Sequence, residues 1–245
     1  MREYFEYHRD FCRYLCAPRK TLVLILCTMR SGSTLLKAML GAASDVSHLP
    51  EVHFHQLRTS AFDFYTRFCR LAPEPIIVLK HPVWFTDSIG TFPVPKLSRI
   101  RMICLVRDCY PTLCSIKTMP GSDTPTNREL IAYWLRYTSQ IVTKHGEAGA
   151  LGRCIRYEDL VADPVTVSAD LFKFIGSKMT HGVKEYVPPM GGEWQWGVDD
   201  GSDKIRSREV QPATTLDQDP ELLALIEADV RIAELRARLG YDARN

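Results

Sequence analysis

The sequence lacks a long hydrophobic run and an excess of charge of either sign. Its longest apolar stretch, Leu22–Cys27, is far shorter than the roughly 20 residues of a membrane-spanning helix, and shorter than the apolar part of a secretory signal. We therefore expect no transmembrane segment and no cleaved leader. The 31 basic residues are balanced by 29 acidic ones, which leaves a net charge of +2. Such a balance indicates no nucleic-acid partner, because nucleic acid is held by clusters of unbalanced basic residues.

The sequence also lacks a metal-binding pattern among its eight cysteines. The spacings of Cys12 and Cys16, and of Cys109 and Cys114, match no zinc motif. Apolar, strand-like runs hold three more: Cys27, Cys104 and Cys154. We expect reduced thiols in a cytoplasmic protein, and no bound metal. Internal repeats and low-complexity tracts are absent from the sequence as well.

What the sequence does contain is an alternation of apolar, strand-like runs with segments of helical period. With 245 residues, 45% of them hydrophobic and 24% charged, it has the composition of one soluble globular domain. Strands that alternate with helices form parallel sheets through right-handed crossovers. The predicted fold class is therefore α/β, a single domain with a central parallel β-sheet flanked by helices on both faces.

The expected elements have approximate bounds. Strands are expected over 21–27, 75–82 and 99–107, and a fourth strand ends within 154–160. Helices are expected over 1–20, 33–43, 56–71, 110–117, 126–146, 164–175 and 219–239. We expect segment 1–20 to pack on the edge of the domain, with a ligand flap or a membrane-surface helix as alternatives. Segment 177–218 is rich in Gly, Pro and polar residues, and a loop this long is typically functional or disordered.

One stretch, Thr21–Leu36, combines an apolar run, a short polar loop and the start of a helical pattern. A buried parallel strand that ends in a turn of small residues and feeds a helix leaves the first N–H groups of that helix unpaired. Arg30 in the loop adds a full positive charge to the partial charge of the helix end. We therefore predict an anion-binding loop here.

Three of the predicted strands end in, or are followed by, a cation: Arg30, Lys80 and Arg107. In open α/β sheets ligands bind beyond the carboxyl ends of the strands, so these side chains converge on one edge. Each cation alone is equally well explained as an ordinary solvated charge. Together the three predict a polyanionic ligand.

The loop differs from a nucleoside-triphosphate P-loop. That motif requires Gly-x-x-x-x-Gly-Lys-Ser/Thr, in which the lysine reaches the phosphates and the hydroxyl holds magnesium. Here Cys27 stands at the first glycine position, Gly32 is followed by Ser33, and the cation precedes Gly32. The neighbouring strand ends in Lys80, where a magnesium enzyme needs an acid. Magnesium-dependent phosphoryl transfer is therefore disfavoured, and a site that supplies its own cations is favoured.

Two segments together resemble the donor site of sulfotransferases that use 3′-phosphoadenosine-5′-phosphosulfate (PAPS). Thr28–Leu36 is similar to the 5′-phosphosulfate loop in the branch of this family that carries Arg there, which includes tyrosylprotein and bacterial sulfotransferases. Val106–Asp108, with Ser115 eight residues after Arg107, resembles the family's 3′-phosphate site. The resemblance implies a P-loop-like fold, PAPS as co-substrate, 3′-phosphoadenosine-5′-phosphate (PAP) as product, and no metal.

Two further segments resemble the family less specifically. Ile155–Pro164 is similar to a family segment whose tyrosine, here Tyr157, is implied to lie near the nucleotide. Lys204 to Ser207 resembles the late loop that covers phosphate and adenine, although the Arg-Lys-Gly pattern of the aryl and steroid branch is missing. The donor contacts that the resemblance implies are Arg30, Ser31, Gly32, Ser33, Thr34, Arg107, Ser115, Tyr157, Lys204 and Ser207.

The implied reaction is in-line transfer of a sulfuryl group from the donor to a hydroxyl or an amine. It requires a base for the nucleophile and positive charge for both the moving group and the departing oxygen. Arg30 and the N–H groups of residues 31–34 suit the leaving side. Lys80 suits either the leaving oxygen or the sulfuryl oxygens.

Two residues compete for the role of general base. Glu51 lies where the Arg-loop branch carries its catalytic glutamate, whereas His81 only partly matches the histidine-containing strand end of the aryl and steroid branch. Histidine has the more convenient unperturbed pKa, but the loop belongs to the Arg branch and Glu51 is favoured. His53 and His55 are weaker candidates, and they are also possible acceptor contacts.

Aromatic residues could form an acceptor pocket, although each alone is better explained as core. The candidates are Trp84, Phe85, Tyr133, Tyr137 and Trp194. We expect a small-molecule or lipid-like acceptor, and the oligomeric state stays open between monomer and homodimer. The alternatives to a sulfotransferase are a kinase-like P-loop enzyme and a nucleotide-binding module without turnover.

Overall fold

The computed structural model describes residues 2–47, 61–83, 97–119, 125–187, 203–212 and 219–241. Its centre is a parallel sheet in the order β2-β1-β3-β4. The strands are β1 (Thr21–Thr28), β2 (Ile76–Val83), β3 (Ile100–Val106) and β4 (Gly152–Arg156). Strand β1 is central, because Thr21 aligns with Ile76 on one side and Leu22 aligns with Ile100 on the other. The predicted α/β class with a parallel sheet is confirmed.

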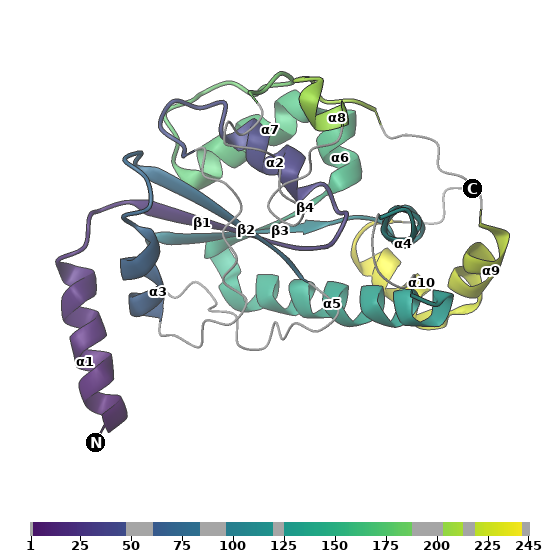
Figure 1. The fold of residues 1–245 in the computed structure, drawn as a ribbon, viewed down its shortest axis with the longest axis horizontal. Coiled ribbons are helices and arrows are strands. Elements are labelled where there is room, and N and C mark those ends of the chain that lie inside the picture. The colour runs from purple at the N-terminus through teal and green to yellow at the C-terminus, as the bar shows by residue number, and fades with distance from the viewer. Residues whose placement is uncertain are drawn as a thin grey trace.

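Different helices cover the two faces of the sheet (Figure 1). One face carries α2 (Ser33–Leu40), α6 (Tyr157–Ala162), α7 (Pro164–Ile175) and α8 (Asp203–Arg206). The other carries α3 (Ala61–Phe68), α5 (Asn127–Ala148) and α10 (Val230–Arg238). Near the end of β3 lie α4 (Cys109–Lys117) and α9 (Pro220–Ala228), and the 3-10 turn η2 (Gly149–Leu151) precedes β4.

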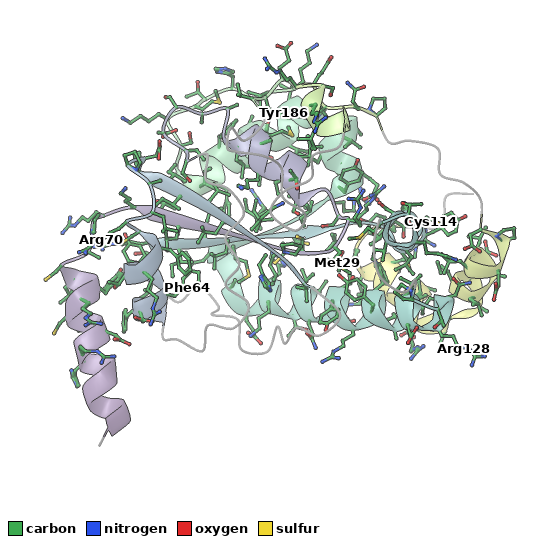
Figure 2. All side chains as sticks on the ribbon, viewed as in Figure 1. Met29, Phe64, Arg70, Cys114, Arg128 and Tyr186 are labelled. Atoms are coloured by element: carbon green, nitrogen blue, oxygen red, sulfur yellow. The ribbon has the colours of Figure 1, made fainter. Side chains whose placement is uncertain are left out.

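The alternation of side chains along the strands creates two hydrophobic cores. In β1, Leu22 and its alternate neighbours pack with α3 and α5, whereas Val23 and its alternate neighbours pack with α2 and α7. Figure 2 shows Phe64 of α3 and Met29, which follows β1, on the α5 side of the sheet. Burial of each large apolar side chain contributes roughly 1.5–3 kcal/mol, so the position of β1 is strongly determined.

Helix α7 carries local sequence signals at both of its ends. The Asp163 carboxylate accepts a hydrogen bond from the N–H of Thr166, Pro164 occupies the first turn, and Gly176 ends the helix at a φ of 78°. The expected bounds of 164–175 are confirmed.

The single helix expected over 219–239 is wrong, because α9 and α10 are separate. Asp229 lies between them with extended backbone (φ −93°, ψ 102°), and its carboxylate accepts a hydrogen bond from the N–H of Arg231. An aspartate that caps a new helix competes with continuation of the old one. The fourth strand ends within the expected 154–160, since β4 ends at Arg156, and α6 begins directly at Tyr157.

Helix α1 (Arg2–Leu15) projects from the body of the molecule and contacts it through α3 (Figure 1). The ring of Tyr14 lies 5.2 Å from that of Phe62 and 5.1 Å from that of Tyr65, centroid to centroid. The expected role of segment 1–20 as a helix packed on the domain edge stays a prediction.

All eight cysteines lie in the described part of the chain, and all are free thiols. Over the described residues, no three His, Cys, Asp or Glu side chains converge as metal ligands. In the same part of the chain, each helix is too short or too polar to cross a membrane.

Candidate functional site

The candidate site lies where the chain changes direction across the sheet. From β1 the chain passes to β2 on one side, and β3 then pairs with β1 on the other side. In open α/β sheets, this switch between the carboxyl ends of two neighbouring strands is the position at which ligands bind. The loop after β1 and the residues after β3 meet at this position.

The loop after β1 has the conformation of an anion cradle. Arg30 has a φ of 57° and Gly32 a φ of 91°, so the loop makes two left-handed bends before α2. Left-handed backbone costs a non-glycine residue of the order of 1–3 kcal/mol and is concentrated at functional sites. Gly32, which has no side chain with which to cap a helix, is the N-cap of α2. The first N–H groups of the helix are therefore not occupied by a capping side chain.

Three predicted donor-binding residues contact one another directly. Arg30 Nε donates a hydrogen bond to Ser115 Oγ at 3.0 Å, and Arg107 Nη1 donates one to the carbonyl oxygen of Arg30 at 2.8 Å. Arg30 comes from the loop, Arg107 from the end of β3 and Ser115 from α4. Two guanidinium groups and a hydroxyl are thus brought to one place by segments that are far apart in the sequence.

Tyr157 forms a wall beside these residues. Its ring centroid lies 4.5 Å from Arg107 Cζ, in a cation–π arrangement. The ring also covers Gly32, since a Cβ atom at that position would lie 2.4 Å from Tyr157 Cδ2. Burial raises the pKa of the Tyr157 hydroxyl and outweighs the opposing effect of Arg107, which keeps the phenol neutral.

Arg107 is partly buried, and one of its N–H groups is unsatisfied among the described residues. Burial lowers the pKa of its guanidinium from the ordinary value, and the Tyr157 and Glu158 side chains oppose that shift. Its Nε is buried and has no hydrogen-bond partner among the described residues. A buried unsatisfied donor costs roughly 1–3 kcal/mol, and such groups in native proteins call for a functional explanation.

Lys80 faces the same side of the sheet as the loop. Its Nζ donates a hydrogen bond to Thr34 Oγ1 at 2.7 Å, and the two side chains are 3% and 6% exposed. His81, the next residue of β2, points to the opposite face, on which Leu79 and Val83 pack against the α5 side. The structure therefore places Lys80, but not His81, against the first turn of α2.

Two of the aromatic acceptor candidates are interior residues. The backbone N–H of Met29 donates to the hydroxyl of Tyr133 at 2.8 Å, and that hydroxyl donates to the carbonyl oxygen of Val83 at 2.5 Å. Tyr137 is 1% exposed, and its ring centroid lies 5.0 Å from that of Tyr133. Both tyrosines thus act in packing, and Tyr133 links the ends of β1 and β2.

The other predicted residues fall into two groups. Ser31 donates from its hydroxyl to the carbonyl oxygen of Thr28 at 2.8 Å, Ser33 is 8% exposed at the start of α2, and Ser207 donates to the carbonyl oxygen of Glu209 at 3.0 Å. Outside the described residues lie Glu51, His53, His55, Trp84, Phe85, Trp194 and the side chain of Lys204.

The sequence did not indicate which residues fix the backbone around Arg107. The indole N–H of Trp134 donates to the carbonyl oxygen of Arg107 at 3.1 Å. Asp108 caps α4 by accepting a hydrogen bond from the N–H of Cys109 at 2.7 Å, and its own N–H donates to Glu158 Oε1 at 3.0 Å. An Asp just before a helix is a readable capping signal. The distant partners leave no comparable signal in the sequence.

The architecture is that of a doubly wound α/β protein, and known structures make the fold more specific. No protein-family model and no curated protein matches the sequence. Solved structures do match, and the sulfotransferase domain of the Synechococcus PCC 7002 olefin synthase has 20% identity and a TM-score of 0.61, with 93% of this chain and 97% of that chain covered.

Two other sulfotransferases show the same likeness. The sulfotransferase domain from the curacin biosynthetic pathway has 19% identity and a TM-score of 0.56, with 92% of this chain and 99% of that chain covered. The sulfotransferase from Alicyclobacillus acidocaldarius has 15% identity and a TM-score of 0.52, with 93% and 98% covered. The chain therefore has the sulfotransferase fold over nearly its whole length.

Proposed function

We propose that this protein is a sulfotransferase that moves a sulfuryl group from PAPS to a hydroxyl or an amine of a small or lipid-like acceptor, without a metal. The observation that carries the proposal is the contact of Arg30 and Arg107 with each other, and of Arg30 with Ser115, at the switch point of a sulfotransferase fold. Two guanidinium groups at one edge of the sheet suit a ligand with several anionic groups.

The two ends of the donor are assigned to different elements. The N–H groups at the start of α2 and the guanidinium of Arg30 suit the 5′-phosphosulfate, because they combine the helix dipole with a full charge. Arg107 and Ser115 suit the 3′-phosphate, the group that distinguishes this donor from ADP-like ligands. The ring of Tyr157 lies against both of these elements, since it stacks on Arg107 and covers Gly32.

Transfer breaks the bond between sulfur and the bridging oxygen of the donor and forms a bond between sulfur and the acceptor oxygen or nitrogen. Negative charge grows on the departing oxygen, and preorganised cations stabilise it. Lys80 is suited to this role because Thr34 holds its ammonium group against the first turn of α2. The acceptor proton passes to a general base.

Glu51 is the base that we propose. Its rival His81 points to the face of the sheet opposite Lys80, away from the side on which α2 begins. A base must come within hydrogen-bond reach of the nucleophile, so this orientation supports the loop carboxylate over the strand histidine.

The experiment is an acceptor screen with isotopically labelled PAPS, read by mass spectrometry. Phenols, primary alcohols, sterols, long-chain alcohols and amines are offered separately, each with and without EDTA. We expect one class to acquire the label, and we expect EDTA to leave the rate unchanged. Tight PAP binding without any labelled product would instead indicate a module without turnover, and activity that depends on ATP and magnesium would indicate a kinase.

A further inference from the structure

Arg107 and Tyr157, whose side chains stack on each other at the site, are each followed in the sequence by an acidic residue. Asp108 follows Arg107, and Glu158 follows Tyr157. The two acids are joined to each other, because the N–H of Asp108 donates to Glu158 Oε1 at 3.0 Å. Arg107 and Tyr157 stack on each other, and the next residues along the chain, Asp108 and Glu158, are also in contact. The second contact fixes the distance between the segment after β3 and the start of α6.

Helix α10 holds the first of these acids. Arg236 donates from Nε to Asp108 Oδ1 at 2.8 Å and from its Nη2 to Asp108 Oδ2 at 3.0 Å. This two-point contact orients the carboxylate as well as attracting it. The same carboxylate caps α4, the helix that carries Ser115. Arg236 therefore acts through one carboxylate on both α4 and the segment after β3.

The residues after α10 hold the second acid. The hydroxyl of Tyr241 donates to Glu158 Oε2 at 2.8 Å. Gly240 makes the turn that brings Tyr241 back, with a φ of 74° and a hydrogen bond from the N–H of Tyr241 to the carbonyl oxygen of Arg236 at 2.9 Å. Arg156 also donates to the carbonyl oxygen of Gly240. The segment after α10 is thus attached to both β4 and α6.

We propose that Arg236 and Tyr241 are positioning residues for recognition of the donor 3′-phosphate, a proposal that rests on the proposed function. Neither side chain is assigned a contact with the donor. Arg236 holds Asp108, the neighbour of Arg107, and Tyr241 holds Glu158, the neighbour of Tyr157. Together they fix Arg107 and Tyr157 relative to Ser115. Residues that orient a metal ligand commonly contribute about 10-fold to 100-fold in affinity, and we expect the lower end of that range for a guanidinium that binds phosphate.

The test compares PAP with 5′-AMP, which lacks only the 3′-phosphate, by isothermal titration calorimetry. The variants are Arg236→Gln, Arg236→Lys and Tyr241→Phe. The matched control is Arg238→Gln, because Arg238 lies on the same helix and is exposed. Thermal midpoints are recorded for all variants, so that a general loss of stability is separated from an effect on the site.

We expect Arg236→Gln to weaken PAP binding about tenfold and to leave 5′-AMP binding within about twofold of wild type. Arg236→Lys keeps the charge but cannot reproduce the two-point contact, so we expect an intermediate loss. Tyr241→Phe should lose less, and Arg238→Gln nothing. A purely structural role would lower the affinity for both nucleotides together, or lower only the thermal midpoint.

An unchanged ratio of PAP to 5′-AMP affinity in Arg236→Gln overturns the positioning proposal while leaving the proposed function intact. If the wild-type protein itself binds the two nucleotides equally, the proposed function fails and the positioning proposal fails with it. The two failures are therefore distinguished by the wild-type measurement alone.

Discussion

Arg30 Nε lies 3.0 Å from Ser115 Oγ, and the hydrogen bond between them joins the loop after β1 to helix α4. Our assignment gives these two side chains to different phosphates of the donor. Their contact means that the two halves of the site are coupled, because movement of the guanidinium toward one phosphate changes the partners of the hydroxyl at the other. On this assignment we expect the two halves of the site to respond to the donor together.

Substitution of Arg107 by alanine should weaken PAP binding more than any other single change at the 3′-phosphate position. Hydrogen bonds to charged groups contribute roughly 1.5–3 kcal/mol, which corresponds to tenfold or more in affinity. Ser115→Ala should lose less, since a neutral hydroxyl contributes about 1 kcal/mol. Titration calorimetry measures both, with Arg101→Ala, at the opposite end of β3, as the control. Equal affinities of wild type and Arg107→Ala for PAP would remove Arg107 from the site.

Gly32→Ala should damage both the fold of the loop and donor binding. A side chain at a φ of 91° is strained, and its Cβ would lie 2.4 Å from the Tyr157 ring. We expect a loss of about 1–3 kcal/mol in the free energy of unfolding, together with weaker PAP binding. Gly146→Ala is the control, because nothing lies within 4 Å of its Cβ position in α5. Stability is measured by denaturant unfolding. A Gly32→Ala protein that is as stable as wild type would contradict the described loop conformation.

Glu51→Ala should abolish turnover and leave PAP affinity nearly unchanged, because a general base acts on the acceptor rather than on the donor. General bases contribute typically 10²–10⁴-fold to the rate. His81→Ala is the informative comparison, measured by kcat with the acceptor found in the screen and by PAP titration. Near-normal turnover in Glu51→Ala, combined with loss of turnover in His81→Ala, would reverse our assignment.

Asp45 should make stability depend on pH. Burial raises the pKa of its carboxyl group, but hydrogen bonds from the Ser177 hydroxyl at 2.7 Å and the Lys178 N–H at 2.8 Å outweigh burial and lower the pKa below the ordinary 3.8. A lowered pKa in the folded state gives a stabilisation that is present above pH 3.8 and is lost as the pH falls through the lowered value.

The corresponding measurement is urea unfolding of wild type and Asp45→Asn at several pH values. We expect the variant to be about 1–2 kcal/mol less stable at pH 7, and we expect the difference to shrink below about pH 4. Asp170→Asn, at an exposed position of α7, is the control. A difference that stays constant down to pH 2 would show that the charge of Asp45 is not the cause.

The sequence predicted those parts of the fold whose cause is local. The loop from Thr28 to Ser33 follows from an apolar run that ends in small residues, and the bounds of α7 follow from Asp163, Pro164 and Gly176. The convergence of Arg30 and Arg107 was also predictable, because the carboxyl ends of parallel strands meet at one edge.

What the sequence did not reveal depends on contacts between distant residues. The two-point contact of Arg236 with Asp108 leaves no periodic trace, and an Arg on an exposed-looking helix is usually a solvated charge. The separation of α9 from α10 was missed for a similar reason. The helical pattern continues across Asp229, and only its capping geometry shows that one helix ends there and another begins.

The central position of β1 has a consequence for how the protein is made. This strand pairs with β2 and β3, both of which follow it in the chain, and its residues from Leu22 to Cys27 are fully buried in the finished fold. At roughly 5–20 residues per second, the ribosome needs on the order of 3–10 seconds to pass from the end of β1 to the end of β2. During that time the most apolar strand of the sheet has no partner strand, so we expect the nascent chain to carry an aggregation-prone apolar segment until β2 is available.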